Sequence, residues 1–161
     1  MEKIKKLSQE IVDILIEKKL KISTAESCTG GMLSEAITDI SGSSQIFEYG
    51  VITYANAVKV RELGVSQATL DEFGAVSEQT CKQMANGVMK KGISDIGVGI
   101  TGIAGPTGAV AGKPVGTIFV GVCNNKKTVI KKLSLNGDRE NNRQSAVLEA
   151  LSLVKDIIVN R

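Results

Sequence analysis

The sequence predicts an α/β fold, a three-layer α/β/α sandwich with a mixed β-sheet, in a single domain spanning residues 1–161. Apolar residues switch between helical spacing and short β-compatible runs along the chain, a pattern typical of helices alternating with strands. Asn124-Asn125 joins two β-compatible runs, a hairpin signal that adds antiparallel pairing. A chain of 161 residues with 42% hydrophobic residues is large enough to bury one core.

The first third of the chain predicts a helix, a strand, a second helix and a second strand. Residues 4–20 carry apolar side chains at helical spacing, and residues 21–25 are short and β-compatible. Helical spacing returns over residues 29–40, where Gly42 ends the helical region. Residues 47–54 include Val51-Ile52-Thr53-Tyr54, a strongly β-compatible run.

Capping residues predict three helices in the middle of the chain. Asn56 is expected to cap a helix that runs through Leu63, with Gly64 as its stop. Ser66 and Ser77 are expected to cap helices over residues 67–73 and 78–91, which Gly74 and Gly92 terminate.

The last third predicts a central strand, a long loop, a hairpin and a final helix. Residues 95–102 are small and apolar without interruption, as in a strand buried on both faces. A glycine-rich loop over residues 103–114 separates this strand from the hairpin strands 115–123 and 126–135. Asp138 is expected to cap a helix over residues 139–159.

The composition excludes several classes of active site. The chain contains no histidine, which removes Ser-His-Asp triads, Cys-His pairs and His-ligated metal sites. Any general base must therefore be a Lys, Asp, Glu, Tyr or Cys side chain. Three widely separated cysteines form no disulfide framework, so a reducing cytoplasm is the expected location.

The composition also bears on partners. The net charge of +3 and the aromatic content of 3% argue against a nucleic-acid surface. No apolar run is long enough to span a bilayer, so no membrane association is expected.

The segment from Ser27 to Gly31 is the first candidate for a binding site. It joins a strand to a helix, where unpaired backbone N–H groups and the helix dipole favour an anion such as phosphate. The alternative is an ordinary junction with Thr29 as the helix N-cap. A further alternative is a thiol enzyme that uses Cys28, whose pKa a helix N-terminus would lower.

Lys59 is the candidate general base. With Asn56 as the N-cap, Lys59 is the third helical residue, where the helix dipole and partial burial lower the pKa of its amine. A neutral lysine can deprotonate a serine, as in Ser–Lys hydrolases. The alternative is a solvated lysine on an amphipathic helix.

Other polar residues lie near the expected ends of these elements. Ser43 and Ser44 are in a turn that begins with Gly42, and Tyr54 ends a strand. Thr101 and Gly102 end the central strand, where α/β sheets commonly bind ligands. Arg139, in the first turn of the last helix, is suited to hold a phosphate, with a surface ion pair as the alternative.

Taken together, these segments resemble the C-terminal domain family of CinA proteins, whose stand-alone members are nicotinamide-nucleotide amidohydrolases. The resemblance covers nearly the whole chain, in order. It depends on Thr24-Ala25-Glu26-Ser27-Cys28-Thr29-Gly30-Gly31, Gly42-Ser43-Ser44, Tyr54-Ala55-Asn56-Ala57-Val58-Lys59, Gly74-Ala75-Val76-Ser77, Gly102-Ile103-Ala104-Gly105-Pro106 and Lys113-Pro114-Val115-Gly116-Thr117.

The resemblance implies deamidation of nicotinamide mononucleotide to nicotinic acid mononucleotide and ammonia, in pyridine nucleotide recycling. It implies a Ser–Lys mechanism that needs no metal and no cofactor, with Ser44 as nucleophile, Lys59 as base and Tyr54 as an assisting hydroxyl. The substrate-binding residues that it implies are Ser27, Thr29, Gly30, Gly31, Thr101, Gly102 and Arg139. The expected assembly is a homodimer or higher homo-oligomer. The alternative is a nucleotide-binding regulatory module without turnover.

One geometric argument conflicts with Ser44 as nucleophile. Ser27 and Ser44 flank one expected helix of about twelve residues, which spans ~18 Å. Lys59 follows the next strand, which returns to the Ser27 edge in a βαβ unit. A single subunit therefore pairs Lys59 with Ser27, the second candidate nucleophile. Ser44 reaches Lys59 only if its loop folds over the sheet, if the strand is short, or if two subunits share the site.

Overall fold

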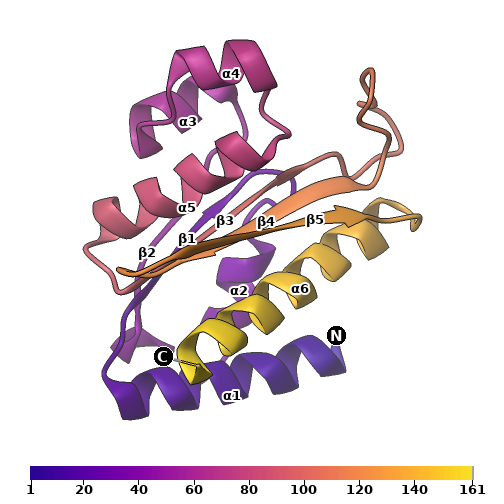
Figure 1. Ribbon diagram of the computed structural model, residues 1–161. Helices are drawn as coiled ribbons and strands as arrows, with labels where there is room; N and C mark the ends of the chain where they lie inside the picture. The colour runs from indigo at the N-terminus through magenta and orange to yellow at the C-terminus, as the bar shows by residue number, and fades with distance from the viewer. Residues whose placement is uncertain (161) are drawn as a thin grey trace.

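The computed structural model describes residues 1–160, which form a five-stranded mixed β-sheet with helices packed against it (Figure 1). The strand order is β2-β1-β3-β4-β5, in which β1 is parallel to β2 and β3, whereas β4 is antiparallel to β3 and β5. The strands are β1 (Ile22–Glu26), β2 (Phe47–Ile52), β3 (Ile96–Gly102), β4 (Thr117–Cys123) and β5 (Thr128–Ser134). The predicted mixed sheet and its hairpin are confirmed. Arg161, the last residue of the predicted domain, lies outside the described residues.

Helices cover both faces of the sheet, which confirms the three layers (Figure 1). One face carries α1 (Glu2–Lys18), α2 (Met32–Thr38) and α6 (Arg139–Val159). The other face carries α5 (Glu78–Gly92), with α3 (Asn56–Leu63) and α4 (Gln67–Phe73) beside it. A short 3₁₀ turn, Ser43–Gln45, precedes β2. None of the helices within residues 1–160 is both long and apolar enough to cross a membrane.

Three of the predicted helix caps are confirmed. Ser66 accepts the backbone N–H of Thr69 at 3.0 Å, and Ser77 accepts that of Thr80 at 3.1 Å. In the same way, Asp138 accepts the backbone N–H of Asn141 at 2.8 Å. These side chains fix the starts of α4, α5 and α6 because each pairs a backbone donor that would otherwise lack a partner.

Three other predicted helix ends were wrong. Asn56 is the first residue of α3 rather than its cap, because Ala55 takes the cap position without a side-chain bond. Thr29 does not cap α2, since its hydroxyl donates to Glu26 and the helix begins at Met32. Helix α5 includes Gly92 and ends at Ile93, whose left-handed φ of 51° lets its N–H bond back into the last turn.

The larger part of the core lies between the sheet and α1, α2 and α6, and a smaller cluster lies beneath α3, α4 and α5. The central strand β3 is buried along almost its whole length, as predicted. Its glycines have a packing role, because a side chain at Gly97 would collide with the backbone carbonyl of Ala85 in α5. This close contact fixes the position of α5 against β3, and with it the position of the loops that join the two elements.

Candidate functional site

The candidate site forms where the parallel strands β1, β2 and β3 end. Ser27 directly follows β1, Thr53 directly follows β2, and Thr101 is the second-last residue of β3. The pairing of Glu26 with both Ile52 and Ile100 aligns these three strand ends at one edge of the sheet. This is the edge at which open α/β sheets bind ligands.

Lys59 of α3 points into this edge and is almost completely buried, with 1% of its surface exposed. Its amine Nζ lies 3.2 Å from the hydroxyl of Ser27. The same nitrogen lies 2.6 Å from the backbone carbonyl of Thr53 and 3.1 Å from that of Tyr54. The turn between β2 and α3 directs both carbonyls at the amine, so the solvated lysine considered from the sequence is excluded.

Burial lowers the pKa of Lys59 from 10.5 to about 8, while the nearby Cys28 acts weakly in the opposite direction. The direction agrees with the prediction, and of the two predicted causes the larger is burial, which removes water from the charged amine. The predicted position was wrong by one residue, since Lys59 is the fourth residue of α3. A substantial fraction of this amine is therefore neutral slightly above neutral pH.

The three partners of Lys59 satisfy either protonation state of its amine, because two are carbonyls that accept and the third is the Ser27 hydroxyl, which can both accept and donate. A neutral amine has two N–H donors and one lone pair, whereas an ammonium group has three donors and no acceptor. The carbonyls of Thr53 and Tyr54 can only accept, and the hydroxyl of Ser27 can donate. In the neutral state, the lone pair of Lys59 therefore faces the Ser27 proton.

Glu26, to which the sequence analysis assigned no role, holds the turn that carries Ser27. Its buried carboxylate accepts from the Thr29 hydroxyl at 2.7 Å and from the Ser34 hydroxyl at 2.7 Å. It also accepts the backbone N–H groups of Leu33 at 2.9 Å and Ser34 at 3.0 Å. A glutamate that ends a strand directly before a glycine-rich turn was the available sequence signal.

The backbone N–H groups of Leu33 and Ser34 at the start of α2 are therefore not available to an anion. Glu26 already occupies the first-turn N–H groups of a seven-residue helix, and its carboxylate already complements the helix dipole. The side chain of Thr29 is fully buried in this network. Gly30 and Gly31 adopt φ angles of 59° and 102°, so they are required by the turn itself.

Arginines of α6 approach the site from the other face of the sheet. Arg143, which the sequence analysis missed, donates to the carbonyls of Cys28 at 3.1 Å and Thr29 at 2.8 Å. Arg139 donates to the carbonyl of Gly105 at 2.8 Å and to the hydroxyl of Tyr54 at 3.2 Å. Their spacing of four residues along one helix was the sequence signal for a shared face.

These two guanidinium groups keep their positive charge available. Within residues 1–160, no ion pair includes Arg139 or Arg143, which excludes the surface ion pair considered for Arg139. Arg139 and Tyr54 are exposed, and their contact joins α6 to the turn that follows β2. Each guanidinium group makes two of the hydrogen bonds described above and has further N–H donors.

Two predicted substrate-binding residues have structural contacts in this chain. The Thr101 hydroxyl donates to the carbonyl of Ala75 at 2.8 Å and thereby holds the segment before α5. Gly102 packs against Ile118 so closely that a side chain would clash there. Both residues shape the edge of the site.

Ser44 does not contact Lys59 within one chain. It is exposed in the 3₁₀ turn that precedes β2, whereas Lys59 lies beyond the other end of that strand. The register pairs Ile22 with Phe47 at the Ser44 end and Glu26 with Ile52 at the Lys59 end. A Ser44–Lys59 dyad inside a single chain is therefore wrong, because the length of β2 separates the two residues.

Cys28 lacks the properties of a nucleophilic thiol. It is 5% exposed, and burial raises the pKa of its thiol to about 12. The prediction that a helix N-terminus would lower this pKa was wrong, because the loss of hydration dominates.

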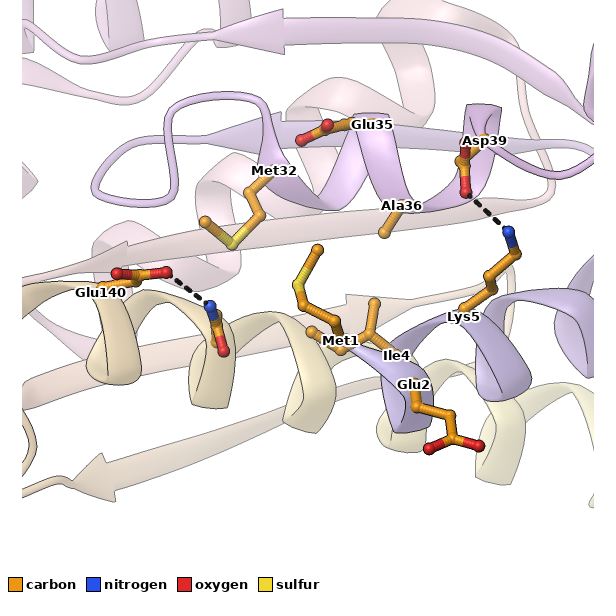
Figure 2. Close-up of a pocket in the computed structure, with 10 residues that line it drawn as sticks. Met1, Glu2, Ile4, Lys5, Met32, Glu35, Ala36, Asp39 and Glu140 are labelled. Carbon is orange, nitrogen blue, oxygen red and sulfur yellow. Dashed lines mark hydrogen bonds and ion pairs between the residues drawn. The ribbon is translucent and has the colours of Figure 1, made fainter.

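A groove with a volume of about 650 Å³ lies elsewhere, among the starts of α1, α2 and α6 (Figure 2). Met1 and Met32 point toward one another across it, and Asp39 pairs with Lys5 at its rim. Neither Lys59 nor Ser27 lines this groove. It is separate from the strand-end site.

Comparison with known proteins identifies the family of this chain. Residues 4–158 match the family model described as the CinA C-terminal domain. The chain belongs to this family. A CinA-like protein from Kosmotoga olearia is 48% identical over 149 residues, which cover 92% of this chain but 36% of that protein. The chain therefore spans little more than a third of the length of this CinA relative.

Solved structures of CinA proteins have the same fold. The competence/damage inducible protein CihA from Agrobacterium tumefaciens superposes with a TM-score of 0.94 at 37% identity, covering 99% of this chain and 96% of that chain. A CinA superfamily protein from Escherichia coli superposes with a TM-score of 0.93 at 31% identity, covering 96% of this chain and 90% of that chain. The names of these relatives specify no substrate.

Proposed function

We propose that this CinA-domain protein is an amidohydrolase that converts nicotinamide mononucleotide to nicotinic acid mononucleotide and ammonia. The observation that carries the proposal is the buried amine of Lys59, 3.2 Å from the Ser27 hydroxyl and otherwise bonded only to carbonyls. The substrate class comes from the resemblance of the motifs to nicotinamide-nucleotide amidohydrolases. The reaction belongs to pyridine nucleotide recycling in the cytoplasm.

Ser27 is the proposed nucleophile within one chain. As its Oγ attacks the carboxamide carbon, neutral Lys59 takes the hydroxyl proton, and the carbonyl electrons move to an oxyanion. Collapse of this intermediate breaks the C–N bond, and Lys59 returns the proton to the departing amine, which leaves as ammonia. Water then attacks the acyl ester with Lys59 again as base, which releases the carboxylic acid and restores Ser27.

Tyr54 is the proposed donor to the oxyanion. Its hydroxyl accepts a hydrogen bond from Arg139 at 3.2 Å, which leaves its own proton free to donate. Tyr54 is 59% exposed, which is consistent with a group that contacts a substrate entering from solvent.

Arg139 is the proposed phosphate ligand, with Arg143 adding positive charge. Arg139 is anchored by Gly105 and Tyr54, and Arg143 by the carbonyls of the turn that carries Ser27. In this proposal, the phosphate of the mononucleotide binds at the outer side of the site, and its carboxamide points toward Lys59.

The test is incubation of the protein with nicotinamide mononucleotide in the presence of a chelator, with measurement of ammonia and nicotinic acid mononucleotide. We expect equal amounts of the two products from the wild type, and formation slower by about 10²–10⁴-fold in the Lys59→Met variant. Thermal stabilisation by the nucleotide without product would instead favour a regulatory binding module. Release of ammonia at an undiminished rate in the Lys59→Met variant would contradict the proposal.

A further inference from the structure

Asn142 is a buried polar residue near the start of α6, three positions after Arg139, and only 1% of it is exposed. Its side-chain amide donates to the backbone carbonyls of Ala104 at 3.0 Å and Gly137 at 2.9 Å. Its side-chain oxygen accepts the backbone N–H of Gly137 at 3.0 Å. Both N–H donors of the amide are therefore used, and the side chain joins two segments that are far apart in the chain.

The first of these segments is the loop that follows β3. Asn142 holds the carbonyl of Ala104, and the next carbonyl along the chain, that of Gly105, accepts the guanidinium of Arg139 at 2.8 Å. Two side chains on one face of α6 thus bind two consecutive carbonyls of the same loop. Residues 106–112 of this loop are exposed. The contacts with α6 are therefore made at the start of the loop, directly after the strand end.

The second segment leads from β5 into α6. Both backbone groups of Gly137 are bonded to Asn142, and the next residue, Asp138, caps the helix. The approach is close, because a side chain at Gly137 would lie 3.0 Å from the Asn142 oxygen. Asn142 therefore fixes the point at which α6 begins, and Arg139 is the first residue of that helix.

Arg139 needs such support because it is exposed. A free arginine side chain samples many rotamers, and ordering it when a ligand binds opposes binding. We propose that Asn142 is a positioning residue for Arg139. By holding the helix start and the Ala104–Gly105 segment together, it orients the guanidinium in advance for the phosphate of a mononucleotide. The identity of this ligand rests on the proposed function.

A buried asparagine that only stabilises the fold is the alternative, and Asn124 provides the matched control. Asn124 is 6% exposed and accepts the backbone N–H groups of Lys126 at 2.8 Å and Lys127 at 2.9 Å. It directly follows Cys123, which pairs with Gly97 near the start of β3, whereas the candidate site lies at the end of that strand. Asn124→Ala therefore removes the hydrogen bonds of a buried asparagine away from the site.

The order of the Arg139 side chain is measured without substrate. Nitrogen-15 relaxation of its Nε–H group reports motion on the picosecond-to-nanosecond timescale, and the Arg139→Met variant identifies its signal. We expect this motion to increase in Asn142→Ala and to stay at the wild-type level in Asn124→Ala. Unchanged motion in a folded Asn142→Ala variant overturns the proposal.

Phosphate recognition is measured as the ratio of kcat/KM for nicotinamide mononucleotide to that for nicotinamide riboside, which lacks the phosphate. Asn142→Ala is expected to lower this ratio by about 3–10-fold, the usual cost of ordering one long side chain, through KM for the mononucleotide rather than kcat. The double variant Asn142→Ala/Arg139→Met should have the same ratio as Arg139→Met alone, because Asn142 acts through Arg139. An unchanged ratio in Asn142→Ala, or a further loss in the double variant, overturns the proposal.

Two further measurements cover unfolding and absent turnover. If Asn142→Ala does not fold, Asn142→Ser takes its place, since its shorter side chain keeps one hydroxyl. The same two effects are expected, and their absence overturns the proposal. If the wild type releases no ammonia, the proposed function fails, and the calorimetric Kd values for the mononucleotide and the riboside replace the kinetic ratio. A wild type that binds the mononucleotide no more tightly than the riboside overturns the role of Asn142 in phosphate recognition.

Discussion

The amine of Lys59 lies 3.2 Å from the hydroxyl of Ser27, although the two residues are 32 positions apart in the chain. Ser27 directly follows strand β1, and the turn after β2 leads into helix α3, which carries Lys59. Two backbone carbonyls occupy the remaining directions of the amine, so its proton exchange is directed at one hydroxyl. This geometry leads to the following predictions.

Lys59 and Ser27 should behave as one catalytic unit. Lys59→Met and Ser27→Ala are each expected to lower kcat for nicotinamide mononucleotide by about 10²–10⁴-fold, the usual contribution of general acid–base catalysis. The double variant should lose little more, because residues that act together are not additive. Steady-state ammonia release measures the effect, and the exposed Lys127→Met is the control. Additive losses, or a fully active single variant, would argue against a dyad.

The reaction should accelerate as the pH rises through the pKa of Lys59. The base must be neutral, and burial lowers its pKa to about 8, so kcat/KM is expected to increase toward pH 8 and then level off. The profile is checked by measuring ammonia release from about pH 6 to about pH 10, roughly two units on each side of the Lys59 pKa. The ammonia must be detected by a method whose response does not change with pH. The Cys28 thiol, whose pKa burial raises to about 12, should add no inflection. A rate that is constant across this range would contradict Lys59 as base.

Removal of the Glu26 carboxylate should destabilise the fold. Glu26→Ala leaves the buried N–H of Leu33 and the partly buried N–H of Ser34 without their acceptor, and we expect a loss of about 2–4 kcal/mol in the free energy of unfolding. Glu35→Ala is the matched control, because Glu35 is exposed on the same helix and should change stability by less than ~0.5 kcal/mol. Urea unfolding measures both. Equal stability of the two variants would refute this role for Glu26.

Arg139 should recognise the phosphate of the substrate. Arg139→Met is expected to raise KM for nicotinamide mononucleotide by about 10–100-fold, since a charge-assisted hydrogen bond contributes ~1.5–3 kcal/mol. The same substitution should leave KM for nicotinamide riboside, which lacks the phosphate, nearly unchanged. Arg61→Met is the control, because the Arg61 guanidinium pairs with Glu62. An equal loss with both substrates would assign Arg139 a structural role.

The elements that local sequence signals define were predictable. Helices α4 and α6 have the predicted bounds because Ser66 and Asp138 cap them through bonds to residues three positions away. The order of strands and helices also predicted that Lys59 meets Ser27, since parallel strands of a βαβ unit end at one edge. The absence of histidine limited the choice of base to a few residue types.

The start of α2 was not predictable in this way. A threonine before a helix is usually its cap, but the buried carboxylate of Glu26 binds the first-turn N–H groups and the threonine itself. The position of the Glu26 carboxylate depends on how β1 and α2 pack, and residue type alone does not indicate that packing. Arg143 was missed for the same reason, since its partners are backbone carbonyls more than a hundred residues away.

The sequence by itself determined the family, the order of the elements and Lys59 as the candidate base, because these depend on residue types and short-range spacing. Only the tertiary structure decided the burial and the orientation of the Lys59 amine. The low pKa of Lys59 arises from burial by other elements, and its orientation arises from two carbonyls that any residues at positions 53 and 54 would present. Every residue has a backbone carbonyl, so a sequence does not indicate which carbonyls contact an amine. Their placement around Lys59 follows from the fold alone.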